Sequence, residues 1–452
     1  MMNKRLVAML VAFAGLLAAE AQVSFSGNGK PVYEAVPSKN TGLDKIYVLY
    51  TAAGVSMSYK ASTDAAVKWY AYGESGGGYA AEIDGVVRAG NVTTLPSVAA
   101  NSGYIIEEGT KRTYLWVTDY SKHRLSLKGL SAEPAGDCGT ATLKVEGCGS
   151  DMAYYTITGV RKTLEREMHL TYKTLAWNDE NQVWEQTDAD ETEDEFKNTI
   201  VIPAPLCNTT FELKGDKYLE FWGEGERVAT SDVYETAAVD VKATAEQEQR
   251  DVDNEKKNTQ DDSALGGSAP VKITFKAYPT DAVVHKEWQM ATDADFNNIE
   301  LRLGDETVEQ TFEEAGTYYW RFFGANSDGS CETYSDVYTV NIGTSELLCP
   351  NVFSPGSSEG VNDVWKVSYK SIVKFKCWIY NRWGNQITVL DDPSQGWDGT
   401  YGGKLVKPGV YYYVIQATGA DGKKYKLKGD INIIRYKSGL GGGTSHGDAD
   451  SN

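Results

Sequence analysis

The spacing of the apolar residues limits the possible folds more than any other feature of this chain. Between residues 23 and 134, short aromatic or β-branched runs alternate with turn-forming residues, and no run is sustained at the helical period of 3.6 residues. Examples are the runs Lys45–Thr51, Val67–Tyr72 and Tyr114–Thr118. Runs of this length between turns predict antiparallel strands, so we expect an all-β, immunoglobulin-like sandwich here.

The same pattern recurs along the chain and predicts tandem modules. In the third module, the run Gly316-Thr317-Tyr318-Tyr319-Trp320 resembles the end of a PKD-type domain, and residues 108–116 echo it weakly, which indicates repeated sandwich modules. The expected divisions are a signal peptide (1–21), two immunoglobulin-like modules (22–135 and 136–243), a charged linker (244–269), a PKD-like module (270–343), a C-terminal β-sandwich (344–437) and a flexible tail (438–452).

The linker prediction rests on composition. The segment from Glu246 to Lys257 is rich in charged residues and nearly free of apolar ones, and Gly266-Gly267-Ser268 follows it. Such a segment buries too little surface to offset the loss of chain entropy on ordering. We therefore expect a flexible linker, and a short solvated helix over residues 245–257 is the competing interpretation.

The first residues have the pattern of an export signal. Lys4 and Arg5 precede an apolar run over residues 6–19, and Ala19-Glu20-Ala21 supplies small residues for cleavage before Gln22. The run is too short for a bilayer span, and no later stretch reaches that length. No cysteine follows the signal closely, so a lipid anchor is not expected. We expect an exported protein that meets a membrane only through a partner.

Charge argues against one class of partner. The formal net charge is −19 and becomes −20 when Lys4, Arg5 and Glu20 are removed with the signal. A chain this acidic repels phosphate backbones, so nucleic-acid binding is disfavoured.

Six cysteines in an exported chain predict disulfides, although six permit 15 pairings. Cys138 and Cys148 flank a glycine-bounded run that we interpret as a hairpin bringing the two sulfurs together. Cys331 and Cys349 bracket the entry into the C-terminal domain and are the second candidate pair. Cys207 and Cys377 are left over.

No catalytic or metal motif emerges from the sequence. The four histidines (His123, His169, His285 and His446) have no metal-binding spacing, and no pair of carboxylates is singled out among more than sixty. We predict no enzyme, no metal site and no required cofactor. Calcium is a weak candidate at two acidic loops, Asp293-Ala294-Asp295 with Asn297 and Asp188-Ala189-Asp190 with Glu193, but a solvated loop is the favoured interpretation of both.

The C-terminal region carries the most specific motifs. They are Cys349-Pro350-Asn351-Val352-Phe353-Ser354-Pro355, Asn362-Asp363, Tyr380-Asn381-Arg382-Trp383-Gly384, Gly396-Trp397-Asp398-Gly399, Pro408-Gly409-Val410-Tyr411 and the closing Ile434-Arg435. Short apolar runs between them predict an antiparallel sandwich. A turn at Gly384 is expected to hold the guanidinium of Arg382 over an aromatic face as a cation–π pair.

In this order, the motifs resemble the gliding-motility-associated C-terminal domain, the type B sorting domain of proteins exported by the type IX secretion system of Bacteroidetes. The chain departs from the family at residues 356–360, where Gly-Ser-Ser-Glu-Gly replaces the usual Asn-Gly-Asp-Gly. The resemblance implies docking to a PorP/SprF-type outer-membrane protein. The docking residues that it implies are Asn362, Asp363, Tyr380, Asn381, Arg382, Trp383, Gly384, Trp397, Asp398, Gly399 and Arg435.

These observations favour a non-catalytic structural or scaffolding protein associated with the type IX secretion or gliding apparatus, located at the outer membrane on the periplasmic face or the cell surface. The first alternative is a secreted surface adhesin that binds glycan or host protein. A secreted hydrolase comes third, because no residue is selected for it.

Overall fold

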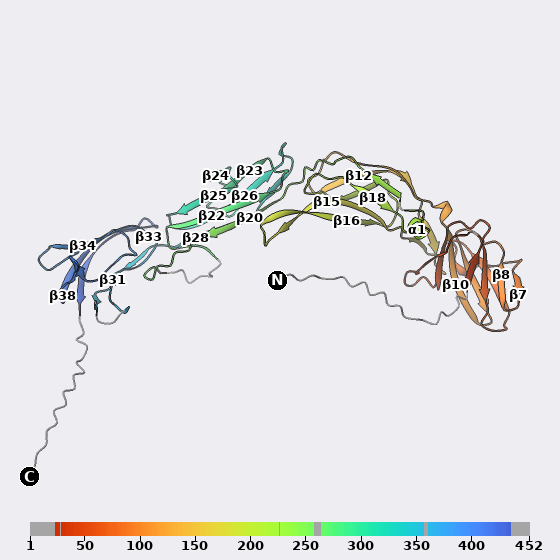
Figure 1. The fold of residues 1–452 in the computed structure, drawn as a ribbon, viewed down its shortest axis with the longest axis horizontal. Coiled ribbons are helices and arrows are strands. Elements are labelled where there is room, and N and C mark those ends of the chain that lie inside the picture. Colours follow the sequence, from red (N-terminus) through yellow and green to blue (C-terminus); the bar gives the residue numbers. More distant parts are fainter. Residues whose placement is uncertain (1–22, 28, 226, 257–263, 357–359, 435–452) are drawn as a thin grey trace, which may run out of the picture. The chain divides into compact units, whose positions relative to one another are not determined.

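The computed structural model describes residues 23–434 apart from residues 28, 226, 257–263 and 357–359, so the predicted signal peptide and the predicted tail lie outside the described residues. The regular structure of the described residues is almost entirely strand, with one α-helix among them, α1 (Lys217–Phe221) (Figure 1). The all-β prediction is confirmed. The contacts divide the chain into two compact units, Met1–Thr174 with Gln186–Thr236 and Leu175–Glu185 with Ala237–Asn452.

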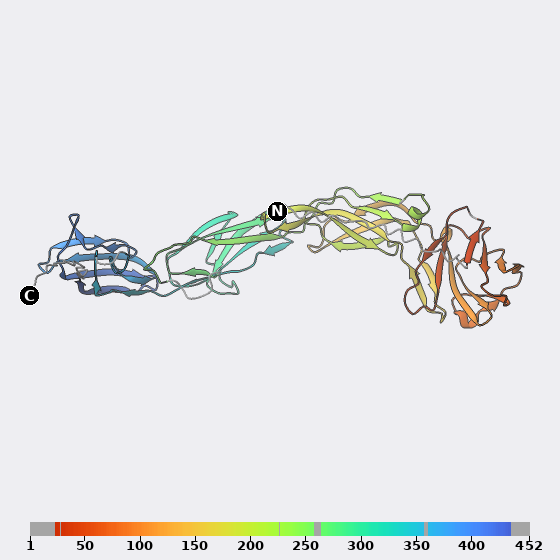
Figure 2. The same cartoon turned by 60° about the horizontal axis from the view of Figure 1, so that its bottom comes forward.

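The first module is a two-layer sandwich (red and orange in Figure 2). One strand pairing, β3 with β10, is parallel, and the others are antiparallel. Trp69, Tyr59 and Tyr104 fill the space between the layers and are at most 1% exposed. One layer has the order β1 (Val23–Ser26), β4 (Ser56–Lys60), β8 (Val92–Leu95), β7 (Val87–Ala89), and the other β2 (Tyr33–Ala35), β3 (Lys45–Leu49), β10 (Lys111–Asp119), β9 (Ser102–Glu108), β5 (Val67–Tyr72), β6 (Ala81–Glu82), with 3-10 turns at Gly77–Tyr79 and Tyr120–Lys122.

A buried carboxylate lies at the end of one strand of this module and accepts several hydrogen bonds. Glu108, at the end of β9, is 5% exposed. It accepts hydrogen bonds from the Tyr59 hydroxyl (2.8 Å), the Ser62 hydroxyl (3.0 Å) and both the hydroxyl (2.7 Å) and backbone N–H (2.6 Å) of Thr63. Burial alone would raise the pKa of this carboxyl, but the four donors outweigh it and lower the pKa of Glu108 to about 2.

Acid is therefore expected to weaken the first module through Glu108. A lowered native pKa stabilises the fold fully above the unfolded pKa of 4.5, and this stabilisation is lost as pH falls from 4.5 through about 2. The loss amounts to about 3 kcal/mol. Urea unfolding of the wild type and of Glu108→Gln at several pH values measures it. The variant should lose this pH dependence, and an unchanged acid profile in the variant would contradict the assignment.

The second module begins earlier than the sequence indicates. Its first strand, β11 (Ser126–Ala132), pairs with β12 (Thr140–Cys148), so the predicted boundary at residue 135 falls after a strand that already belongs to this module. Its sheets are β11, β12, β17 (Thr199–Pro203); β13 (Met152–Tyr155), β14 (Arg161–Leu164); and β16 (Val183–Glu193), β15 (Met168–Asn178), β18 (Glu212–Gly215), β19 (Arg227–Thr230).

The first two modules share a hydrophobic core. Ile46, Val48 and Trp116, on the six-stranded sheet of the first module, belong to the same buried cluster as Met152 and Tyr154 of β13. That sheet therefore buries apolar side chains on both faces, since its other face contributes to the core within the first module. The two modules form one unit rather than two independent domains.

A buried ion pair fixes this junction. Arg166 and Asp216 are at most 1% exposed, and their side chains are 2.5 Å apart. Arg166 also donates to the backbone oxygens of Ser150 (2.7 Å) and His123. Asp216 accepts from the Tyr120 hydroxyl of the first module (3.1 Å) and caps helix α1 through the N–H of Leu219 (3.2 Å).

The third module packs its core around Phe275, Trp288 and Trp320, and the rings of Phe275 and Trp320 stack at 4.5 Å. The tip of the β15–β16 hairpin belongs to the same unit, where Trp184 donates to the oxygen of Tyr278 (2.8 Å). The sheets are β20 (Val241–Gln247), β22 (Val271–Pro279), β25 (Thr307–Phe312), and β21 (Leu265–Gly267), β28 (Tyr338–Ile342), β26 (Gly316–Ala325), β23 (His285–Ala291), β24 (Leu301–Leu303), with β27 (Glu332–Tyr334) beside β26.

The predicted flexible linker is partly wrong. Its first residues lie in β20, which pairs with β22 along its whole length. The segment at Asn254 then docks on the C-terminal domain: its side chain donates to the oxygens of Val367 (2.7 Å) and Pro393 (2.8 Å), and its backbone oxygen accepts from Tyr369 (3.1 Å). Residues 257–263 lie outside the described residues.

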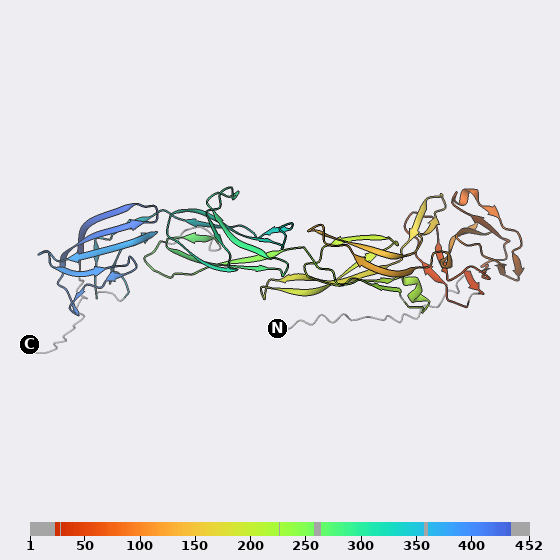
Figure 3. The same ribbon diagram turned by 90° about the horizontal axis from the view of Figure 1, so that it is seen from above.

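The C-terminal domain is a sandwich whose main layer is a five-stranded sheet (blue in Figure 3). Its core contains Trp365, Ile379, Trp397 and Ile415. The main sheet has the order β30 (Val352–Phe353), β39 (Lys424–Ile433), β38 (Gly409–Gly419), β33 (Ile372–Tyr380), β34 (Gln386–Leu390), and the shorter pairs are β29 (Glu346–Leu348) with β32 (Ser368–Lys370), β31 (Trp365–Lys366) with β35 (Gly396–Trp397), and β36 (Thr400–Tyr401) with β37 (Lys404–Leu405).

Both predicted disulfide pairings are wrong, although disulfide bonding itself is confirmed. Cys138 and Cys331 are disulfide-bonded, whereas Cys148 and Cys349 are free thiols, as are Cys207 and Cys377. The run between Cys138 and Cys148 forms the single strand β12, about 30 Å long, and not a hairpin: Cys148 ends this strand, whereas Cys138 lies two residues before its start. Cys349 packs against the C-terminal core instead of clamping Cys331.

Candidate docking site in the C-terminal domain

The loop between β33 and β34 is built around Asn381. Its side-chain oxygen accepts the N–H groups of Trp383 (2.9 Å) and Asn385 (3.0 Å), and its backbone oxygen accepts the N–H of Gly384 (3.0 Å). Gly384 has φ of 81°, a left-handed conformation that glycine adopts without strain. The tight loop leaves Arg382 and Trp383 at its tip, both exposed.

Arg382 lies over the indole ring of Trp383, with 4.3 Å between the guanidinium carbon and the ring centroid. This is the cation–π arrangement that the sequence predicts. Trp383 is nevertheless 71% exposed. The cation restricts the motion of this side chain, which nevertheless remains exposed to solvent. Such an aromatic residue is a typical anchor for a binding partner, because it offers a large contact area and loses little conformational entropy on binding.

A groove of about 790 Å³ runs beside this loop. One wall is the loop itself. The other comes from Tyr401 of β36, from Lys407, and from Val410 of β38, which extends past the end of β33. Tyr401 is 58% exposed and Val410 is 40% exposed. Among the described residues, no carboxylate lines the groove, although the chain as a whole is strongly acidic. The groove thus combines exposed aromatic rings with the positive charges of Arg382 and Lys407.

Three residues that the resemblance implied for docking shape a turn instead: Trp397 and Gly399 are buried, and Asp398 is exposed but bonded within the turn. Trp397 is 3% exposed, and its indole N–H donates to the oxygen of Thr400 (2.9 Å). Asp398 accepts from the backbone N–H (2.9 Å) and the hydroxyl (2.7 Å) of Thr400. Gly399 has φ of 78°, and a side-chain carbon there would lie 2.7 Å from Pro355. They shape the turn from β35 to β36.

The remaining predicted docking residues are Asn362, Asp363, Tyr380 and Arg435. Asp363 accepts from the N–H groups of Gly356 (3.2 Å) and Gly360 (2.8 Å), so it organises its own loop, and Asn362 adopts a left-handed φ of 54° beside it. Tyr380 is half-buried at the end of β33. Arg435 lies outside the described residues.

Sequence reasoning did not assign Tyr401, Lys407 or Val410 to this site. Val410 lies in the quoted Pro-Gly-Val-Tyr run, but only the pairing of β38 with β33 places that run beside the loop. The pairing is set by contacts distant in sequence, so local patterns do not reveal it.

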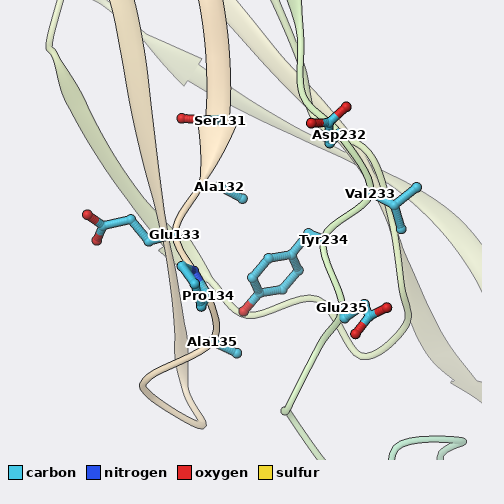
Figure 4. Close-up of a pocket in the computed structure, with 9 residues that line it drawn as sticks. All are labelled: Ser131, Ala132, Glu133, Pro134, Ala135, Asp232, Val233, Tyr234 and Glu235. Carbon is cyan, nitrogen blue, oxygen red and sulfur yellow. The ribbon is translucent and has the colours of Figure 1, made fainter.

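A second hollow, of about 410 Å³, lies in the N-terminal unit between residues 131–135 and 232–235 (Figure 4). Tyr234 is 4% exposed and its hydroxyl points toward Pro134 and Ala135, with no hydrogen-bond partner among the described residues. The side chains of Glu133 and Glu235 point away from the tyrosine ring (Figure 4). This arrangement brings no set of ligand-binding groups together.

Both acidic segments considered for calcium have protein partners, and the one at Asp188 to Glu193 lies in strand β16 rather than in a loop. Asp293 accepts from the backbone N–H groups of Asn297 (2.9 Å) and Asn298 (3.2 Å). Asp188 pairs with Lys173 (2.5 Å), and Asp190 lies 3.0 Å from His169. Within the described residues, no group of three or more His, Cys, Asp or Glu side chains is placed to hold a metal ion. The same part of the chain contains no helix long and apolar enough to cross a membrane.

Comparison with known proteins identifies two segments. Residues 131–231 match the family model "Fibronectin type III domain", and residues 347–433 match "CHU_C Type IX secretion signal domain". No curated protein matches the chain.

Solved structures resemble the chain only remotely. "Sidekick-1 immunoglobulin domains 1-5" is 10% identical with a TM-score of 0.25, and the match covers 90% of this chain and 81% of that one. The three N-terminal domains of the highly immunogenic outer capsid protein (Hoc) of bacteriophage RB49 are 9% identical with a TM-score of 0.21, over 70% of this chain and all of that one.

Proposed function

We propose that this exported protein, which carries a type IX secretion signal domain at residues 347–433, docks to an outer-membrane protein through the groove beside Arg382 and Trp383. The secretion signal and the disulfide-bonded cysteines indicate export. The fibronectin-like match and the tandem sandwiches point to a non-enzymatic cargo protein with immunoglobulin-like modules.

The partner that fits the resemblance is a PorP/SprF-type outer-membrane barrel. In this proposal the C-terminal domain stays bound to the barrel, and the upstream sandwiches act as a structural or scaffolding component of the secretion or gliding apparatus. The single observation that supports docking most strongly is Trp383, which lies at the tip of an ordered loop and is 71% exposed. An exposed tryptophan of this kind typically contributes about 2 kcal/mol or more to a protein interface.

Substituting Trp383 with alanine is expected to weaken binding to the barrel by roughly 30-fold, because about 2 kcal/mol of interface energy is lost. The measurement is a titration of the purified barrel in mild detergent with the wild type and the variant. Tyr79→Ala is the matched control: Tyr79 is 82% exposed but lies in the first module, so its loss should leave the affinity unchanged.

Recovery of the native protein from its own cells separates this proposal from the adhesin alternative. Co-purification of an intact C-terminal domain with a barrel and other secretion proteins supports the scaffold. Recovery from the surface or the medium without the C-terminal domain would contradict it and identify a released adhesin.

A further inference from the structure

The C-terminal domain differs in charge from the rest of the chain. Residues 347–433 contain eleven Lys and Arg against seven Asp and Glu, a formal charge of +4, within a chain of formal charge −19. Five of the eleven cations are lysines on β33 and β39: Lys374, Lys376, Lys424, Lys426 and Lys428.

The strand register places these five lysines on one face of the five-stranded sheet. Side chains alternate along a strand, so residues two apart share a face. Lys376 pairs across β38 with Lys426, and Lys374 pairs in the same way with Lys424. All five lysines are exposed, whereas the residues between them on β33 and β39 are buried or half-buried. They form a regular array, spaced about 7 Å along the strands and about 10 Å across them.

The same face carries an apolar and aromatic band. Val414 pairs with Trp378 on one side and with Lys428 on the other, and Tyr412 pairs with Tyr380 in the next row. Tyr412 is 45% exposed and Val414 is 39% exposed, so both lie open to solvent. The lysine array and this band together are called the basic face below.

Most of the positive charge on the basic face has no internal counter-charge. Lys376 lies 3.1 Å from Asp391. Among the described residues, no ion pair involves the other four lysines. Asp430 is the only carboxylate at an outward position of β33, β38 and β39, and it accepts a hydrogen bond from Asn432 (2.6 Å).

We propose that the basic face lies against the anionic headgroups of a phospholipid membrane. A flat array of lysines with no arginine matches a diffuse layer of phosphates, since lysine acts as a mobile point charge whereas arginine favours the fixed, bidentate recognition of a single group. Tyrosine and tryptophan are the aromatic residues that prefer the headgroup region. An acidic protein surface would satisfy the charges but would not need the adjoining band of Tyr412, Trp378 and Val414.

The test is co-sedimentation of the full mature chain with vesicles of phosphatidylcholine containing about one-third phosphatidylglycerol. We expect binding that falls as salt is raised, and little binding to phosphatidylcholine alone. Replacing Lys374, Lys426 and Lys428 together with glutamine should lower the partition coefficient on the order of 100-fold, since each surface lysine contributes about a factor of five. Tyr412→Ala should cause a several-fold loss that persists at high salt.

The control is an equal change of charge elsewhere. Lys39, Lys128 and Lys162 are exposed lysines of the N-terminal unit, and their joint replacement by glutamine should leave vesicle binding unchanged. Equal binding to neutral and anionic vesicles, no binding to either, or an equal loss in the control would overturn the proposal. Because the vesicles contain no protein, such a result would leave docking through the Trp383 groove standing.

Discussion

Replacing Arg166 with methionine is expected to lower the free energy of unfolding of the N-terminal unit by about 3 to 5 kcal/mol, because the substitution strands a buried carboxylate. Asp216 would keep the hydroxyl of Tyr120 and the N–H of Leu219 as donors but would lose its cation. Two backbone oxygens, of His123 and Ser150, would also lose their donor. Guanidinium unfolding with hydrogen exchange of peptides from β12 and β15 would locate and measure the loss.

A double variant distinguishes the effect of the unpaired charge on stability from the effect of lost side-chain packing. The double variant Arg166→Met with Asp216→Asn leaves no unpaired charge and should recover much of the lost stability. The surface pair Arg161–Asp151, whose side chains are 52% and 39% exposed, supplies the matched control: Arg161→Met should change stability by less than about 1 kcal/mol. A buried pair that behaved like this surface pair would contradict the assignment.

The second large effect is expected at Trp397. Its indole packs against Phe353 (5.5 Å between ring centroids) and Tyr411 (5.1 Å), and the side chain is 3% exposed. Trp397→Ala should therefore destabilise the C-terminal domain by about 3 to 5 kcal/mol, the usual range for emptying a large core site. Hydrogen exchange of peptides from β33 and β38 in denaturant would report this domain separately from the others.

Trp383→Ala is the control for the Trp397→Ala measurement. Trp383 is 71% exposed, so its loss should change the stability of the same domain by less than about 1 kcal/mol while weakening docking. Equal destabilisation by the two substitutions would show that Trp383 is a structural residue and would remove the main support for the docking groove.

These two tryptophans also show where sequence reasoning reaches its limit. Each is followed closely by glycine within a short polar motif, so the sequence alone does not distinguish them. Burial depends on pairing: β35 aligns Trp397 with Trp365 at the centre of the domain, whereas the loop built on Asn381 carries Trp383 outward. By contrast, the Arg382–Trp383 contact depends on adjacent residues and a local turn, and it was predictable.

The shared core of the first two modules has a signal in the sequence. Strand β3 buries four consecutive residues, Ile46 to Leu49, and β10 buries Leu115 to Asp119. A strand with one solvated face alternates between apolar and polar residues, whereas unbroken apolar runs are typical of strands covered on both faces. The predicted linker failed at its start because strand β20 begins at Val241, before the predicted boundary at residue 244, and its alternation of Val241, Ala243 and Ala245 with polar residues continues past that boundary.

The six-stranded sheet of the first module is covered on both faces, so the order in which the chain crosses a membrane decides when that sheet is fully covered. A polypeptide that crosses a membrane amino end first delivers residues 23–120 before its second module. Until the strand at Met152–Tyr155 follows, Ile46, Val48 and Trp116 lack their partners from the second module and lie on an exposed apolar surface of the first. The smallest piece of this protein that can leave a channel or a holding chaperone without an exposed apolar sheet is therefore the whole pair of modules.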